Sequence, residues 1–110
     1  MSAQHRDLAA GRWNELTFFE QMANIGSEIE RALNWRAKNN AVYSERAFER
    51  ALELLDLTLA AKHRWGRLKE LARVREAVVD YFIGTNTSAS TESSWKSYFL
   101  AFTYAARRTR

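Results

Sequence analysis

The sequence predicts an all-α protein, a single domain folded as an antiparallel (up-down-up-down) four-helix bundle. Three observations support this prediction. Apolar residues recur every three or four positions in four separate segments, the period of a helix packed on one face. The chain has 110 residues, which is enough for one hydrophobic core. It contains no proline and four glycines, so few residues interrupt a helix. A three-helix core with the fourth helix docked loosely is the alternative.

The first helix is expected over residues 13–38 and the second from Tyr43 or Ser44 to Ala61. Asn39 and Asn40 are expected to form the turn between them, because asparagine tolerates left-handed backbone. The main apolar face of the second helix includes Phe48, Ala51, Leu52, Leu55 and Leu59. Its opposite side carries an acidic stripe of Glu45, Glu49, Glu53 and Asp56.

The third helix is expected from Arg67 to Ile83, with Gly84 as a left-handed cap after its last turn. Arg75 lies near the centre of its apolar stripe. An unpaired charge in a core is costly, so we predict a buried ion pair of Arg75 with Asp56 or Glu53, with Glu28 as another partner. The alternatives are an arginine that reaches water at a helix end, and an anion site around Arg75.

The last helix is expected to begin at Ser90 or Thr91, either of which can cap it. Its apolar face is Trp95, Tyr98, Phe99, Phe102 and Ala106. Before it, residues 85–91 form a polar loop that we expect to be mobile. Residues 1–11 are expected to be flexible. The whole chain, residues 1–110, is expected to form one helical domain.

Composition argues against most enzyme and metal-site classes. The chain has no cysteine, no G-x-S-x-G motif and no glycine-rich phosphate loop. It has no Glu-x-x-His pair, and its two histidines, His5 and His63, stand far apart in the sequence. We therefore predict no enzyme activity, no cofactor and no metal. No apolar run approaches the roughly 18 residues of a membrane span, so the expected location is the cytoplasm, without a membrane partner.

Two sets of side chains are candidates for contact with a partner. Large apolar residues off the main stripes suggest a protein interface, formed by a homodimer or a dedicated protein partner. These residues are Trp13, Trp35, Leu100 and Tyr104. The net charge of +4 permits contact with polyanions, although acidic and basic residues alternate along most of the chain. The candidate polyanion contacts are Lys62, Arg64, Arg67, Arg107, Arg108 and Arg110.

The runs NIGSEIERALNWRAKNN, ERALELLDLTL, RLKELARVREAVVDYFIGTN and SWKSYFLAFTYAARR resemble a family of short, uncharacterised prokaryotic helical-bundle proteins. The architecture also resembles the HEPN class of four-helix bundles. That class implies dimers, pairing with a small nucleotidyltransferase and, in some branches, RNA cleavage. In the cleaving branches an arginine is followed, after four to six intervening residues, by a histidine. Before His63 those positions are Asp56, Leu57 and Thr58, so the resemblance implies a non-catalytic branch.

Together these observations predict a cytoplasmic, non-catalytic bundle that acts through protein–protein association. The alternative is an accessory protein that binds nucleic acid through the basic 62–67 turn and the C-terminal arginines.

Overall fold

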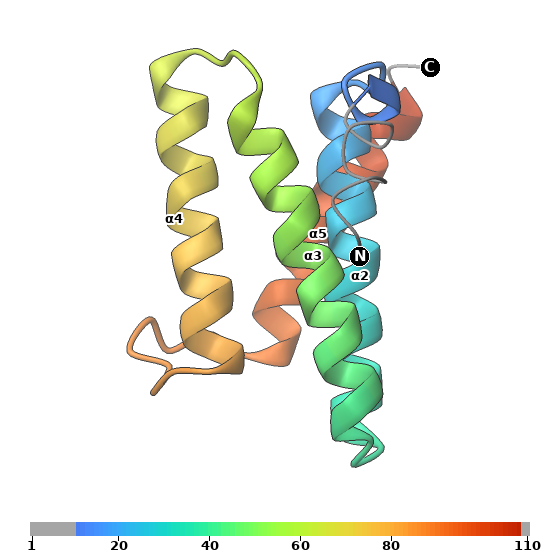
Figure 1. Cartoon of the computed structure of the whole chain (residues 1–110), viewed down its shortest axis with the longest axis vertical. Coiled ribbons are helices and arrows are strands. Elements are labelled where there is room, and N and C mark those ends of the chain that lie inside the picture. The colour runs from blue at the N-terminus through green and yellow to red at the C-terminus, as the bar shows by residue number, and fades with distance from the viewer. Residues whose placement is uncertain (1–10, 109–110) are drawn as a thin grey trace.

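The computed structural model describes residues 11–108 and contains no strand within them. A short helical turn at residues 11–13 precedes four long helices. Their bounds are Phe18–Ala37 (α2), Ala41–Ala60 (α3), Trp65–Phe82 (α4) and Glu92–Arg108 (α5). The predicted all-α class is confirmed. Consecutive helices run in opposite directions (Figure 1), as an up-down-up-down arrangement requires.

The four helices do not pack equally. α2 has extensive contacts with α3 on one side and with α5 on the other, whereas α4 packs mainly on α3 and over a smaller area (Figure 1). The alternative prediction, a three-helix core with the last helix docked loosely, is therefore wrong. The last helix, α5, is well packed, and α4 is the loosely packed helix. Side chains still connect α4 to the rest, since the guanidinium of Arg36 lies 5.2 Å from the ring centre of Tyr81.

α2 begins later than the predicted residue 13, because Thr17 and Glu20 form a capping box. The Glu20 amide donates to Thr17 Oγ1 at 3.1 Å, and the Thr17 amide donates to Glu20 Oε1 at 2.9 Å. Such caps typically stabilise a helix by about 1 kcal/mol. The chain before Thr17 is thereby released from the helix, so that Trp13 can turn back onto the core.

The turn between α2 and α3 follows the prediction for Asn39 and Asn40. Asn39 has a φ of 62°, in the left-handed region. The Asn40 amide donates to the Trp35 carbonyl at 2.9 Å, which closes the end of α2. The Asn40 side chain then accepts from the Tyr43 amide at 3.0 Å. α3 consequently begins at Ala41, slightly earlier than expected.

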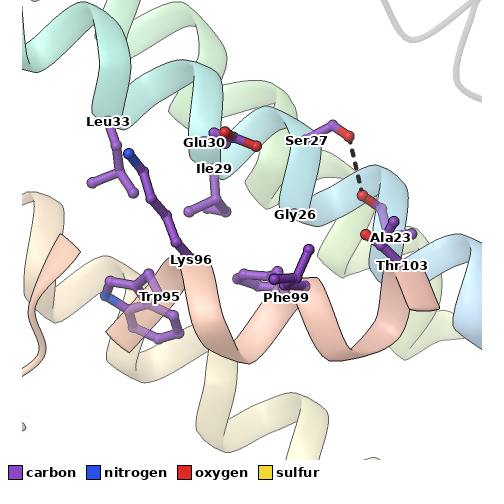
Figure 2. A pocket seen from close by; sticks show the side chains of 11 residues that line it. Ala23, Gly26, Ser27, Ile29, Glu30, Leu33, Trp95, Lys96, Phe99 and Thr103 are labelled. Carbon is purple, nitrogen blue, oxygen red and sulfur yellow. Dashed lines mark hydrogen bonds between the residues drawn. The ribbon is translucent and has the colours of Figure 1, made fainter. Parts of the chain in front are cut away.

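All four long helices contribute buried side chains to the core, and Gly26 sets how closely α2 approaches α5. A methyl group built on Gly26 would lie 2.6 Å from Cβ and 2.9 Å from Cγ of Phe99. Figure 2 shows Phe99 directly against this part of α2. The fully buried side chains around it pack as in other protein interiors. They include Met22, Ile25, Ile29, Leu55, Leu71 and Val78.

The segment between α4 and α5 is tied by hydrogen bonds around Asp80 and Asn86. The Asp80 carboxylate accepts from the Ser88 amide at 3.1 Å, and the Asn86 side chain bonds both the amide and the carbonyl of Ser90 at 2.9 Å. Thr91 caps α5 by accepting from the Ser94 amide at 3.0 Å, one of the two caps expected.

The prediction for Gly84 is wrong, since it does not have a positive φ. Its place is explained by Asp80, whose carbonyl and carboxylate oxygens would lie 3.0 Å from a Cβ at Gly84. The left-handed residues in this segment are Asn86 and Ala89, with φ of 56° and 53°.

Candidate interaction surfaces

Arg75 pairs with Asp56, but at the surface. Its Nε donates to Asp56 Oδ1 at 2.7 Å, and the two side chains are 37% and 56% exposed. The hydrogen bond to Asp56 raises the pKa of Arg75 above its usual value, against a smaller opposing effect of burial. The predicted burial is therefore wrong. α4 buries Leu71, Val74 and Val78, and Arg75 lies at the edge of that face, from where it reaches α3.

The acidic stripe on α3 has several environments. Asp56 forms the pair with Arg75, Glu53 is half-buried, and Glu45 and Glu49 are exposed. Glu45 and Glu49 line an open groove between α3 and the end of α4, together with Phe48 and Phe82. The hydrogen-bonded partner of Arg75 is thus Asp56.

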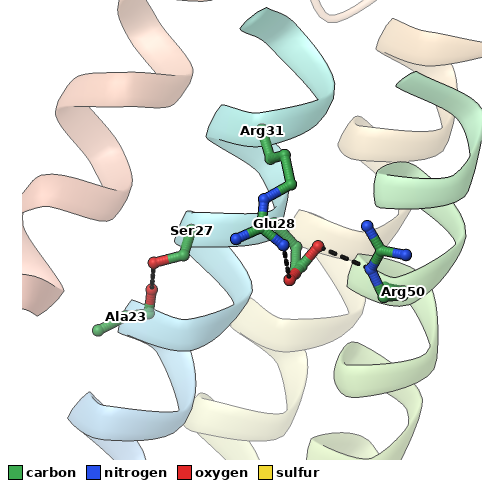
Figure 3. Close-up of polar contacts among 5 residues, drawn as sticks. All are labelled: Ala23, Ser27, Glu28, Arg31 and Arg50. Carbon is green, nitrogen blue, oxygen red and sulfur yellow. Dashed lines mark hydrogen bonds and ion pairs between the residues drawn. The ribbon is translucent and has the colours of Figure 1, made fainter. Parts of the chain in front are cut away.

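A second charged cluster connects α2 to α3, and the sequence analysis did not find it. Glu28 is only 15% exposed and accepts from Arg31 at 3.0 Å and from Arg50 at 3.1 Å (Figure 3). Glu28 was considered as a partner of Arg75, but α3 supplies Arg50 instead. The three-residue spacing of Glu28 and Arg31 was a usable signal, whereas the contact with Arg50 depends on the tertiary fold.

Trp13, a candidate interface residue, is a core residue. It is 7% exposed, its Nε1 donates to Thr58 Oγ1 at 2.9 Å, and its carbonyl accepts from the Gln21 side chain at 2.9 Å. Trp35 is half-buried against Tyr43, with ring centres 4.9 Å apart. These two tryptophans are therefore occupied by contacts within the chain, and Trp13 presents no surface to a partner.

The other two candidate interface residues are exposed on α5. Leu100 is 51% exposed and Tyr104 is 58% exposed, one helical turn apart on the same face. Residues 97–106 contain no charged side chain. The outer face of a surface helix usually carries charges, and those of α3 and α4 do, with Glu49 and Arg50 on α3 and Lys69 and Arg73 on α4.

The candidate basic residues lie at one end of the molecule. Lys62, Arg64 and Arg67 are exposed around the connection from α3 to α4. Arg107 and Arg108 are exposed at the end of α5, which Figure 1 shows at the same end of the bundle. Arg110 lies outside the described residues. The two sets are some forty residues apart in the sequence, and the antiparallel arrangement brings them to one end.

Two features of this basic end were not anticipated. Trp65 is 75% exposed, more than any other large apolar side chain in residues 11–108. The Arg67 guanidinium lies 4.0 Å from the ring centre of Phe18, which also contacts the rings of His63 and Phe102. His63 itself hydrogen-bonds the Thr58 carbonyl, and His5 lies outside the described residues. The signal for Trp65 was its position in the sequence KHRWGR.

Tyr98 connects α5 to α4. Its hydroxyl donates to Glu70 Oε1 at 2.9 Å. Burial, and then the hydrogen bond to Glu70, raise the pKa of Tyr98 well above its usual value, so it is protonated at neutral pH. This bond supplements the limited packing between the two helices.

The hollow between α2 and α5 is too small for a metabolite. It measures about 60 Å³ and is lined by Gly26, Ile29, Trp95, Lys96 and Phe99, among others (Figure 2). Small-molecule sites are typically about 300–1,000 Å³. The buried Trp95 Nε1 has no hydrogen-bond partner among residues 11–108. A hollow of this size is large enough for a water molecule and too small for most metabolites.

Neither a metal site nor a membrane span is present in the part of the chain that the structure describes. No three histidine, cysteine, aspartate or glutamate side chains of that part gather as metal ligands. None of its helices is both long enough and apolar enough to cross a bilayer.

Comparison with known proteins gives no relative: no family, no curated protein and no solved structure matches this chain.

Proposed function

We propose that this chain is a non-catalytic interaction protein that associates with a second copy of itself through the outer face of α5. The observation that carries the proposal is the uncharged stretch of residues 97–106, with Leu100 and Tyr104 exposed in its middle. A helix that is apolar on all sides is usually buried on all sides, and most side chains of residues 97–106 are apolar. α2 covers the inner face of α5, which leaves the outer face for a partner.

The charges at the two ends of α5 favour a second copy over a foreign partner. Two-fold symmetric dimers place the same surface patch of each copy against the other. If two α5 helices cross antiparallel at Leu100, residues equally distant from Leu100 face each other. Glu92 of one copy then faces Arg108 of the other, and Lys96 faces Tyr104. In this arrangement no like charges face each other, and Leu100 of one copy packs against Leu100 of the other.

The expected association is reversible. α5 has 17 residues, so it is about 25 Å long, and one helix pair of this length buries less than a standard protein interface. We therefore expect a dissociation constant of about micromolar, as for interfaces at the low end of the size range.

The non-catalytic part of the proposal is supported by the sequence, which lacks the motifs of nucleophilic, metal-dependent and nucleotide-dependent enzymes. The HEPN-like resemblance and the cytoplasmic location stay predictions. Nucleic-acid binding, the alternative, depends on a different surface at the end of the bundle.

Sedimentation equilibrium over a range of protein concentrations tests the proposal. The wild-type chain should sediment between one and two chain masses, and Leu100→Glu should shift it to one, because it places two like charges at the centre of the contact. Ile83→Glu is the matched control, since Ile83 is also exposed but lies after α4, away from α5's outer face. A wild-type chain that remains monomeric at about millimolar concentration contradicts the proposal.

A further inference from the structure

The basic end of the bundle has a composition suited to a polymer that carries both phosphates and flat rings. We propose that it binds single-stranded nucleic acid, with backbone phosphates at Lys62, Arg64 and Arg67 and a base stacked on Trp65. This inference goes beyond the proposed dimer and does not depend on it.

The cations of the 62–67 turn are available to a ligand. Lys62, Arg64 and Arg67 are exposed, and none of them forms an ion pair with another residue of 11–108. Arg67 is held in place because its guanidinium lies on the ring of Phe18. A cation that is fixed before binding loses less conformational entropy when it meets a phosphate.

Trp65 provides the stacking surface. Tryptophan is usually well buried, yet Trp65 is the most exposed large apolar side chain of the described chain. Its ring has no aromatic or cation contact within residues 11–108, unlike Trp35, which packs on Tyr43. An open indole between Arg64 and Arg67 matches the combination of basic groove and aromatic platform on which single strands bind.

The surrounding charge supports a polyanion. Further cations lie on segments that Figure 1 places at the same end: Arg12 on the short turn at residues 11–13, and Arg107 and Arg108 at the end of α5. Two carboxylates near this end already have partners: Glu70, one helical turn after Arg67, accepts from the Tyr98 hydroxyl, and Glu20 is engaged in the cap of α2. Arg108 also belongs to the proposed dimer contact, so the proposal depends on residues 62–67 and uses the α5 arginines only as additional attraction.

Other polyanions fit this end less well. An acidic peptide would pair with the cations but does not carry a flat ring beside every charge. An anionic membrane surface is usually met by a helix with a wide apolar face, and Trp65 is the one strongly exposed large apolar side chain of the basic turn. A single strand supplies a phosphate and a base in every nucleotide.

Fluorescence anisotropy of labelled oligonucleotides, dT10 and rU10, tests the proposal with the full chain. Neutralisation of three phosphates predicts that the logarithm of the association constant falls with the logarithm of salt concentration with a slope of about −2. Trp65→Ala should weaken binding at least about fivefold, the lower end of the stacking contribution of one base. Absence of binding at low salt would overturn the proposal.

Two matched controls separate the site from general charge and general aromaticity. Lys62→Gln/Arg64→Gln and Lys69→Gln/Arg73→Gln remove the same charge from exposed positions, but only the first pair should reduce affinity markedly. Tyr43→Ala removes an exposed aromatic ring at the other end of the bundle and should leave affinity unchanged. Equal losses in the two charge variants would overturn the proposal.

Vesicles of phosphatidylcholine and phosphatidylserine distinguish the remaining source of phosphate. Vesicle binding that Trp65→Ala abolishes, together with no binding of dT10 or rU10, would assign this end to a membrane surface and refute the nucleic-acid proposal.

Discussion

Gly26 provides the sharpest test of the packing between α2 and α5. In Gly26→Ala the new methyl group would lie 2.6 Å from Cβ of Phe99, a distance that real side chains do not adopt. The contacted atoms are the base of the Phe99 side chain, so a change of rotamer cannot relieve the contact and α5 must move. Overpacking of this kind costs about 1–3 kcal/mol.

The helix preference of alanine opposes this cost. Replacing glycine by alanine inside a helix gains about 1 kcal/mol. Because the contacted atoms, Cβ and Cγ of Phe99, lie close to the backbone, we take the upper part of the overpacking range. Subtracting the gain in helix preference leaves a net destabilisation of about 1–2 kcal/mol. For a domain of this size that corresponds to a fall in Tm of roughly 5–15 °C.

Thermal and urea unfolding followed by circular dichroism measure the effect, with Gly66→Ala as the control. Gly66 lies in the first turn of α4, and no atom would come within 4 Å of its added methyl group. Gly66→Ala should therefore stabilise the protein by up to about 1 kcal/mol. If Gly26→Ala stabilised the protein as much as Gly66→Ala, the close approach of α2 and α5 would be refuted.

Three further predictions concern single contacts. Thr58→Val leaves the buried Trp13 Nε1 without its acceptor and should lower the free energy of unfolding by about 1–3 kcal/mol in urea titrations; an unchanged midpoint would contradict the buried hydrogen bond. Arg75→Met removes a surface ion pair and should change that free energy by less than about 1 kcal/mol, so a larger loss would restore the idea of a buried pair. Hydrogen bonds from the Ser88 amide, and then from Thr87 and Asn86, lower the pKa of Asp80 below its ordinary 3.8. The ionised Asp80 therefore stabilises the folded state fully above pH 3.8, and this contribution is lost as the pH falls through the lower pKa of the folded state. Asp80→Asn should accordingly flatten the acid end of a plot of Tm against pH, and an unaltered acid limb would show that the bonds to Asp80 do not contribute.

The fold class was predictable because it depends on local pattern. The four apolar periods and the tolerance of Asn39 for left-handed backbone are properties of short segments, and both predictions hold. The start of α2 was also readable, since Thr17 and Glu20 have the spacing of a capping box, a signal that the prediction of a start at residue 13 did not use.

The positions of individual side chains were less predictable because they depend on how much each helix is covered. Arg75 is near the centre of an apolar stripe on α4, yet α4 buries only part of that stripe, so the pair with Asp56 stays at the surface. Trp13 was made an interface candidate because it lies off the main apolar stripe, and its partner Thr58, 45 residues away, could not be read from local pattern. Trp65 was missed because the exposure of a side chain depends on the tertiary fold rather than on the local pattern.

The limited packing of α4 has a consequence for how the molecule opens. Local unfolding in native proteins proceeds in cooperative units, and the unit with the fewest buried contacts opens at the lowest free energy. α4 is that unit here, so its amide hydrogens should exchange with solvent before those of α2, while α2, α3 and α5 remain folded. Trp65 and Arg67 lie in the first turn of α4, so a ligand bound to them would slow amide exchange along the whole helix. The exchange rate of α4 would therefore measure how much of the protein has ligand bound.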